Sequence, residues 1–396
     1  MIVGIAITAL ALPVLGWTGY LAWLALLSWA NPLPPDGEPR TRFEIVVPAH
    51  DEEGGIGATI ASLQAIDYPT AMQRLTVIAD NCTDATASRA RAAGANVLER
   101  TDPERRGKGY ALAHVFERIL AAGEVDAVVV VDADTKVTPN LLRAFDARFR
   151  AGARAAQAEY CVANPGSSWR TRLMHIGFTL FHDVRSRARE RMGVSAGLRG
   201  NGMAFAVPLL REVPHDAFSV VEDVEYGIRL GRAGYRVYYA GEARVFGDMV
   251  SSEKASRSQR RRWEGGRLAL AKTHAPGLLA DGLARRSLTL LDLAFDLLVP
   301  PITYVALAVM AGTFVAALWI GLAHGPWWTA LPWAFCLLAF GLYVLRGVWL
   351  ANVGPRVVLD LAWAPVYMVW KVVLALRSSP SKEGEWVRTA REGDKS

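Results

Sequence analysis

Cysteine and histidine are scarce in this chain of 396 residues, which holds three Cys and seven His. The cysteines, Cys82, Cys161 and Cys336, are odd in number and far apart. A disulfide framework or a cysteine-based zinc site needs closer, paired residues, so both are excluded and a reducing compartment is expected. The histidines are scattered without the spacing of metal ligands.

The common nucleotide-binding loops are also missing. Gly54-Gly55-Ile56-Gly57 lacks the spacing of a dinucleotide fingerprint, and Gly107-Lys108 lacks the surrounding P-loop. The net charge is +6, but the basic residues gather beside apolar segments and not between exposed aromatics on a polar domain. This distribution favours an anionic membrane face over nucleic acid as the partner.

Charged residues are absent from Ile2–Ala30, which exceeds the about 20 apolar residues that cross a membrane. A cleaved signal peptide would begin with basic residues and have a shorter apolar core, so we expect an anchor. Pro300–Ala323 and Trp327–Leu345 are two further expected spans. Basic residues follow the first span and flank the later pair, which predicts a multi-pass protein of the cell inner membrane with its middle portion in the cytoplasm.

The segment Val357–Leu376 is ambiguous. It is long enough to span, but Asp360, Pro365 and Lys371 interrupt it. We expect an interfacial or re-entrant helix here, and a fourth span is the alternative. The apolar segments show no paired broken helices of the kind that transporters have.

The middle of the chain alternates short apolar runs with helical patterns. Val128–Val131, four β-branched residues in a row, is typical of a strand buried on both faces. The alternation predicts an α/β fold with a mostly parallel sheet. We expect strands at Phe43–Pro48, Leu75–Asp80, Asn96–Glu99 and Asp126–Val131, and helices at Ile56–Ile66, Ala85–Ala93 and Tyr110–Ala122.

Polar residues follow the expected strands, at the sheet edge where parallel sheets bind ligands. Asp132-Ala133-Asp134 places two carboxylates on one side of an extended chain, where they can share Mg2+ or Mn2+. A solvated turn is the alternative reading of this common motif. Glu222-Asp223 opens a helical pattern, and helix capping by these carboxylates is the alternative to a catalytic role.

A third motif is Gln259-Arg260-Arg261-Arg262-Trp263. A guanidinium can bind pyrophosphate oxygens through two hydrogen bonds, and an indole can stack on a sugar. A basic interfacial helix is the alternative here.

In this order, the motifs resemble the membrane-embedded branch of the family 2 glycosyltransferases, which includes cellulose synthase, hyaluronan synthase, poly-N-acetylglucosamine synthase and ceramide glucosyltransferase. The resemblance covers roughly Arg42 to Trp263 and departs from the family pattern at Val221, in place of Thr, and Asp51, in place of Asn. It implies a GT-A nucleotide-sugar-binding domain and an inverting hexosyl transfer that depends on Mg2+ or Mn2+.

The resemblance also implies a role for each site residue. Asp223 is the expected general base with Glu222 beside it, and Asp134 and Asp132 are the expected metal ligands. The expected donor-binding residues are Pro48, His50, Glu52, Asp80, Lys108, Asp132, Gln259 and Arg262. The expected acceptor-binding residues are Trp263, Asn201 and Gly202.

The membrane segments bear on the acceptor. Apolar residues recur at helical spacing from Trp169 to Val184, and six arginines lie between Arg170 and Arg191, which predicts an interfacial helix, with a core helix as the alternative. We therefore expect a UDP-linked donor and a lipid or lipid-linked saccharide acceptor, in glycolipid or exopolysaccharide biosynthesis. A processive polysaccharide synthase, completed by oligomerisation or pathway partners, is one alternative. A non-catalytic membrane scaffold or nucleotide-sugar sensor is another.

These expectations divide the chain into six parts. They are an anchor (1–30), a linker (31–41), a cytoplasmic GT-A domain (42–250), interfacial helices (251–296), two membrane helices (297–345), and an interfacial or re-entrant helix with a basic tail (346–396).

Overall fold

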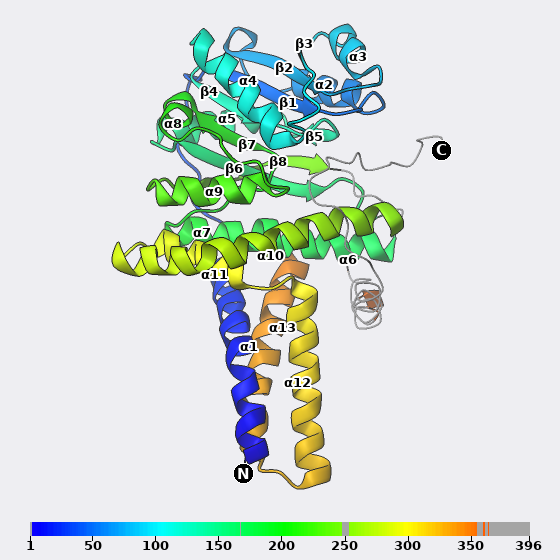
Figure 1. Cartoon of the computed structure of the whole chain (residues 1–396), viewed down its shortest axis with the longest axis vertical. Helices are drawn as coiled ribbons and strands as arrows, with labels where there is room; N and C mark the ends of the chain where they lie inside the picture. Colours follow the sequence, from blue (N-terminus) through cyan, green and yellow to red (C-terminus); the bar gives the residue numbers. More distant parts are fainter. Residues whose placement is uncertain (1, 167, 248–252, 355–358, 361–362, 364–396) are drawn as a thin grey trace. The chain divides into compact units, whose positions relative to one another are not determined.

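The computed structural model describes residues 2–166, 168–247, 253–354, 359, 360 and 363 (Figure 1). The chain forms two compact units. The first, here called the helical unit, combines Met1–Ala30, Pro165–Met192 and Asp296–Pro380. The second, the α/β unit, combines Asn31–Asn164, Gly193–Phe295 and Ser381–Ser396.

A mixed sheet of eight strands forms the centre of the α/β unit, in the order β3-β2-β1-β4-β7-β6-β8-β5. Four of the seven neighbouring pairs are parallel, and β7 is antiparallel to both β4 and β6. The predicted α/β class and mostly parallel sheet are therefore confirmed. The strands are β1 Phe43–Ala49, β2 Gln73–Asp80, β3 Asn96–Arg100, β4 Ala127–Val130, β5 Thr135–Val137, β6 Ala155–Val162, β7 Met203–Ala206 and β8 Tyr238–Gly247.

Helices pack on both faces of this sheet (Figure 1). In β1, Ile45 and Val47 join the apolar core on one face and Val46 joins the core on the other, as the alternation of a strand requires. Each fully buried aliphatic side chain of this kind contributes roughly 1.5–3 kcal/mol. The first core includes α2 Ile56–Gln64, α3 Thr86–Ala92 and α5 Leu141–Arg150; the second includes α4 Lys108–Ala122, α8 Val207–Glu212 and α9 Glu222–Arg232.

The predicted strands and helices agree with the structure to within two residues at each end. One of the largest differences is at the start of α4, which begins at Lys108, two residues before the predicted Tyr110. Gly107 takes a φ of 135°, which glycine adopts readily, and this turn brings Lys108 into the first position of the helix.

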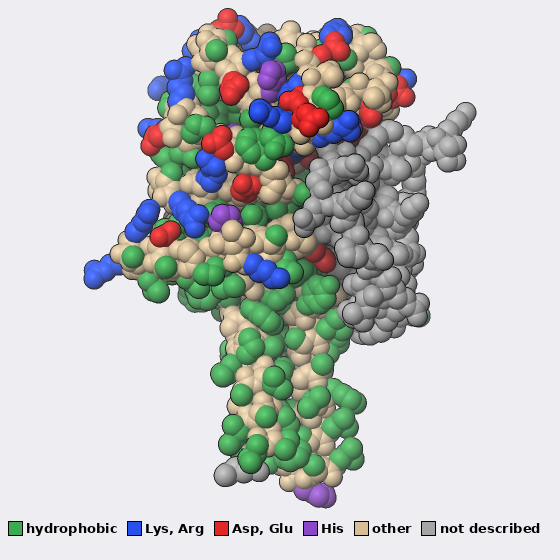
Figure 2. Space-filling view, in the orientation of Figure 1, with side chains coloured by type: hydrophobic (Ala, Val, Ile, Leu, Met, Phe, Trp, Pro, Cys, Tyr) green, Lys and Arg blue, Asp and Glu red, His purple; other side chains and the backbone are tan. Residues whose placement is uncertain are grey.

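Among its described residues, the helical unit contains three helices that are long and apolar enough to cross a membrane, Ile2–Leu27, Ile302–Ala323 and Trp327–Ala351. They correspond to α1 (Ile2–Leu27), α12 (Ile302–Ala323), and η3 (Trp327–Ala330) with α13 (Leu331–Ala351). Their visible surface is largely hydrophobic (Figure 2). The predicted helix at Val357–Leu376 lies almost entirely outside the described residues.

A further helical segment of this unit comprises α6 (Trp169–Phe178), the π-helix η2 (Thr179–Val184) and α7 (Arg185–Met192). Its apolar side chains Ile176, Leu180 and Val184 are buried in one core with residues of α1, α12 and α13. The prediction of an interfacial helix was therefore wrong for this stretch, and the core-helix alternative is correct. The structural reason is that the apolar stripe faces other helices of the same unit.

Three buried charges stabilise this core. Asp296, in α11 (Leu288–Leu298), lies 2.7 Å from Arg185 and 2.9 Å from Arg189. Arg189 also donates to the hydroxyl of Tyr20 on α1, and Arg185 to that of Tyr343 on α13. The two guanidinium groups thus share the carboxylate of Asp296 within an apolar surrounding.

Replacement of that carboxylate should destabilise the protein strongly. In Asp296→Asn two buried cations lose their counter-charge, and we expect a loss of about 3–5 kcal/mol. Thermal unfolding of the detergent-solubilised protein measures it. Asp67→Asn is the matched control, because Asp67 pairs with Arg143 on the surface at 68% side-chain exposure and should unfold like the wild type. Equal melting of the two variants would contradict the expectation.

Candidate active site

The loops that follow three neighbouring strands form one side of the candidate site. β1 lies between β2 and β4 and is parallel to both, so the carboxyl ends of the three strands meet at one edge of the sheet. His50 follows β1, Asp80 ends β2, and Asp132 follows β4. The sequence order alone had indicated this convergence.

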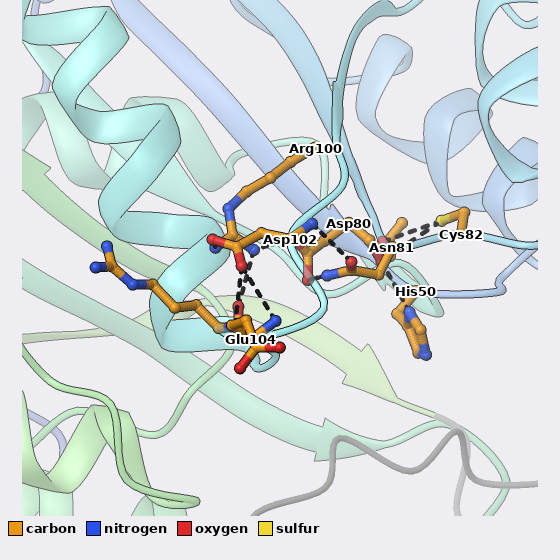
Figure 3. Close-up of polar contacts among 9 residues, drawn as sticks. His50, Asp80, Asn81, Cys82, Arg100, Asp102 and Glu104 are labelled. Carbon is orange, nitrogen blue, oxygen red and sulfur yellow. Dashed lines mark hydrogen bonds and ion pairs between the residues drawn. The ribbon is translucent and has the colours of Figure 1, made fainter.

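Asp80 is fully buried at the end of β2 (Figure 3). Its carboxylate lies 2.5 Å from the guanidinium of Arg100 and accepts a hydrogen bond from the side chain of Asn81. The ring of His50 bonds the carbonyl oxygen of Asp80 at 2.8 Å. A buried carboxylate held on two sides is a rigid acceptor for a ligand placed at this edge.

Two other predicted donor residues are near this edge. Pro48 is buried within β1. The backbone N–H of Glu52 donates to the hydroxyl of Thr86, at the start of α3. A direct contact of either side chain with a donor remains a prediction.

Lys108 joins the Asp-x-Asp turn to the acidic pair. Its ammonium donates to Asp132 and to the carbonyl oxygen of Gly200, each at 2.5 Å, and lies 3.7 Å from Glu222. Burial lowers the pKa of Lys108, but Asp132, Glu222 and Asp223 outweigh this effect and raise it above its usual value. Lys108 therefore stays charged, and these three carboxylates surround it.

The acidic pair stands in the first turn of α9. Burial raises the pKa of both Glu222 and Asp223 above their ordinary values. The positive charges of Lys108 and Arg199 oppose this shift at Asp223. A carboxylate with a raised pKa is a stronger proton acceptor than a solvated one, which suits general-base catalysis.

Asp134 is partly buried, two residues beyond Asp132. The pKa of the Tyr160 phenol in β6 is raised, mainly because the ring is buried. The negative charges of Asp132 and Asp134 raise it further. The two oxygen donors on one side of the turn fit a hard divalent cation that also binds phosphate. Elsewhere among the described residues, the side chains of Asp51, Cys82 and Asp84 bring three possible metal-binding atoms close together. This group does not include Asp132 or Asp134.

The structure assigns Asn201 a different role from the one predicted. The side chain is fully buried, accepts from the backbone N–H of Asp132 at 3.1 Å, and donates to the hydroxyl of Thr135 at 2.8 Å. Its polar atoms are thus used to hold the Asp-x-Asp turn. The prediction that Asn201 contacts the acceptor was wrong, because the side chain points into this turn.

The glycines beside Asn201 allow the loop to approach the site. Gly200 has a φ of +79°, and a methyl group there would lie 3.4 Å from a carboxylate oxygen of Asp223. Gly202 has a φ of +67°, and its methyl group would lie 2.9 Å from Val245. Gly202 also donates its N–H to the carbonyl oxygen of Val130, so it packs against the sheet. Its contact with the acceptor stays a prediction.

The last predicted motif lies on α10 (Glu253–Ala284). Gln259, Arg262 and Trp263 share one helix face by their spacing of three and four residues. The structure describes the side chain of Trp263, which is 37% exposed, but not those of Gln259 and Arg262. A methyl group on Gly266, one turn later, would lie 3.0 Å from Val221, which brings this part of α10 beside the start of α9.

Three site residues escaped the sequence analysis: Arg100, Tyr160 and Arg199. Arg100 could have been found, because it ends the strand that follows Asp80 and is paired with it in register. No sequence pattern marks Tyr160 and Arg199. They come to lie at the site because of the order in which the antiparallel strands pair, which the sequence does not show.

Comparisons with known proteins agree with this geometry. A family model described as glycosyltransferase like family 2 matches residues 39–266, more than half of the chain. A beta-monoglucosyldiacylglycerol synthase from Synechocystis is 29% identical over 230 residues, which are 56% of this chain and 47% of that protein. An N-acetylglucosaminyltransferase from Rhizobium meliloti is 27% identical over 322 residues, 75% of this chain and 70% of the relative.

A glucosyl-3-phosphoglycerate synthase from Mycolicibacterium paratuberculosis is 40% identical over 123 residues, 28% of this chain and 36% of its own length. The chain thus spans less than half the length of the Synechocystis and Mycolicibacterium relatives. Among solved structures, a mannosyltransferase from Pyrobaculum calidifontis in complex with GDP-Man and Mn2+ has a TM-score of 0.59 at 20% identity, over 94% of this chain and 99% of that one.

This last likeness shows the fold, a GT-A type of α/β domain with associated apolar helices. The family match covers the whole sheet, the acidic pair and the start of α10. The chain therefore belongs to the family 2 glycosyltransferases.

Proposed function

We propose that the protein transfers a sugar, with inversion, from a UDP-linked sugar to a hydroxyl group of a membrane lipid or lipid-linked saccharide. One observation carries this proposal: Lys108 ties the Asp-x-Asp turn to an acidic pair whose pKa values are raised. Such an arrangement combines a binding place for the donor diphosphate with a base for the acceptor hydroxyl. A non-catalytic scaffold or sensor would not need that base.

The chemistry is a single displacement at the anomeric carbon. Asp223 accepts the proton of the acceptor hydroxyl while its oxygen forms a bond to that carbon. The bond from the carbon to the diphosphate oxygen breaks, and the nucleoside diphosphate leaves with the electron pair. Glu222, beside Asp223 in the first turn of α9, orients the acceptor hydroxyl.

The departing diphosphate needs positive charge around it. Asp134 and Asp132 would hold Mg2+ or Mn2+, which supplies Lewis-acid stabilisation of this charge. Lys108, buried next to Asp132, adds a fixed cation on the same side, and Arg262 on α10 would bind the diphosphate. Asp80 and His50 would hold the base and ribose at the end of β2 and β1, and Pro48, Glu52 and Gln259 would complete the donor site.

The acceptor class rests on two observations. The described part of the chain includes three helices apolar enough to cross a membrane, and one relative is named a beta-monoglucosyldiacylglycerol synthase. Both favour a lipid-borne acceptor over a soluble one. The proposal includes the location predicted from charge, which is the inner membrane with the GT-A domain (42–250) in the cytoplasm. It also includes the other predicted domain bounds.

Product analysis tests the function directly. The purified chain, given a panel of labelled nucleotide sugars and membrane lipid extract, should make a lipid-soluble product that carries one or a few sugars. EDTA should stop the reaction, and Mg2+ or Mn2+ should restore it. A ladder of long polymer would favour the processive alternative, and activity that is indifferent to chelation would remove the metal from Asp132 and Asp134.

Asp223→Asn tests the base. The amide cannot accept the proton, so we expect the transfer rate to fall by about 10²–10⁴-fold. Binding of UDP, measured by calorimetry, should stay near that of the wild type because the donor site is built from other residues. Glu212→Gln, an exposed carboxylate in the same unit, should leave the rate unchanged. A fully active Asp223→Asn enzyme would take the base role away from this residue.

Arg199→Gln should change the pH dependence of the rate. The positive charge of Arg199 favours the ionised form of Asp223, so its removal raises the pKa of that carboxyl. The base is active only when ionised, and the acidic limb of the pH–rate profile should therefore move to higher pH. Arg199→Lys keeps the charge and should restore the limb. Profiles that coincide in all three proteins would exclude this coupling.

A further inference from the structure

Two exposed apolar side chains lie close together in one loop of the α/β unit. Among the described residues from 43 to 247, the exposed large hydrophobic side chains are Phe218 at 42% and Val220 at 44%. They lie two residues apart in the loop that ends at Glu222, where α9 and the acidic pair begin. Single exposed apolar residues are common, but two beside a catalytic pair point to a contact surface.

This loop is held firmly by three side chains of α9. The hydroxyl of Tyr226 donates to the carbonyl oxygen of Val213 at 2.7 Å, and Arg229 lies 2.9 Å from Asp216. Glu225 accepts from the backbone N–H of Ser219 at 2.9 Å. The loop is thus preorganised with Phe218 and Val220 outward, which reduces the entropy cost of binding a ligand there.

The same loop packs against the start of α4, next to Lys108. A methyl group on Gly109 would collide with the carbonyl oxygen of Ala217 and lie 3.3 Å from the Cα of Phe218. The Phe218 ring stacks on Tyr110, with ring centroids 4.3 Å apart and an interplanar angle of 9°. Phe218 is therefore fixed between the helix that begins with Lys108 and the helix that begins with Glu222.

Trp263 is a third exposed apolar side chain, on the part of α10 that lies next to Val221. It lies one turn before Gly266 on α10, the glycine that packs against Val221, and is 37% exposed. We call Phe218, Val220 and Trp263 the apolar edge. It borders the first turn of α9, where an acceptor hydroxyl must lie to reach Asp223.

We propose that Phe218 and Val220 bind the apolar part of the acceptor, the alkyl or acyl chain next to the reacting hydroxyl group. The inference rests on the function proposed above and adds the residues that distinguish a lipid-borne acceptor from a soluble one. The atoms attached to a hydroxyl group held at Asp223 come to lie over the adjoining loop. A soluble saccharide has no apolar segment to cover these side chains, whereas a lipid chain removes them from water.

Matched acceptors test this proposal with the full chain. Octyl glucoside and methyl glucoside share a head, as do dioctanoylglycerol and diacetylglycerol, and each pair differs only in the length of its apolar chains. We expect the wild type to favour the member with the longer chain. In Phe218→Ser/Val220→Ser, the ratio of kcat/KM for the longer-chain acceptor to that for its partner should fall about tenfold. Leu33→Ser, an exposed apolar residue of the same unit, should keep the wild-type ratio.

The ratio separates acceptor recognition from a general loss of activity, which would lower both kcat/KM values alike. Val220→Ser alone leaves the Phe218 stack intact and should lower the ratio by a smaller factor. UDP binding reports that each variant has folded. A wild-type enzyme without preference for the chain, or variants that keep the preference, would overturn the inference and leave the proposed function standing. A wild-type enzyme that hydrolyses the donor but transfers to none of the four acceptors or to lipid extract would instead remove the proposed acceptor class.

Discussion

The gathering of three carboxylates around a single ammonium group governs the candidate site. Asp132, Glu222 and Asp223 act on Lys108, and like charges so close together in a partly buried site would repel without it. Lys108 compensates this repulsion in part, since the pKa values of Glu222 and Asp223 remain raised. The site is thus negative and strained electrostatically, a state that a divalent cation and the proton of an acceptor would both relieve.

The fold makes this concentration of charge possible by bringing three separate parts of the chain together. The parallel strands β1, β2 and β4 deliver their loops to one edge of the sheet, and the antiparallel strand β7 begins just after the loop of Gly200, Asn201 and Gly202. Asn201 uses both ends of its amide to hold the Asp-x-Asp turn. The glycines on either side have positive φ values, and Gly200 approaches Asp223 where a larger residue would crowd the base.

Buried charge is used differently in the helical unit. Asp296 is shared by Arg185 and Arg189, whose remaining contacts include the hydroxyls of Tyr20 and Tyr343. These groups join the segment α6-η2-α7 to α1 and α13 by directional bonds, which apolar packing alone does not provide. In the α/β unit, by contrast, burial of the acidic pair outweighs the nearby positive charge of Lys108, and this keeps the pKa values of Glu222 and Asp223 raised.

By itself, the sequence determined the α/β class, the elements around β1 to β4, the three apolar helices and the family of the motifs, because strand alternation, helical spacing and motif order are local properties of a chain. It also located Asp80, Asp132 and Glu222 at element ends. Only the tertiary structure decided that Arg100 holds Asp80, that Asn201 and Gly202 support the turn and the sheet, and that Arg185 and Arg189 are buried. It also decided that Phe218 and Val220 stand exposed beside the acidic pair. Those outcomes depend on strand order, on the packing of distant helices and on the solvent each side chain loses, none of which is encoded within a few neighbouring residues.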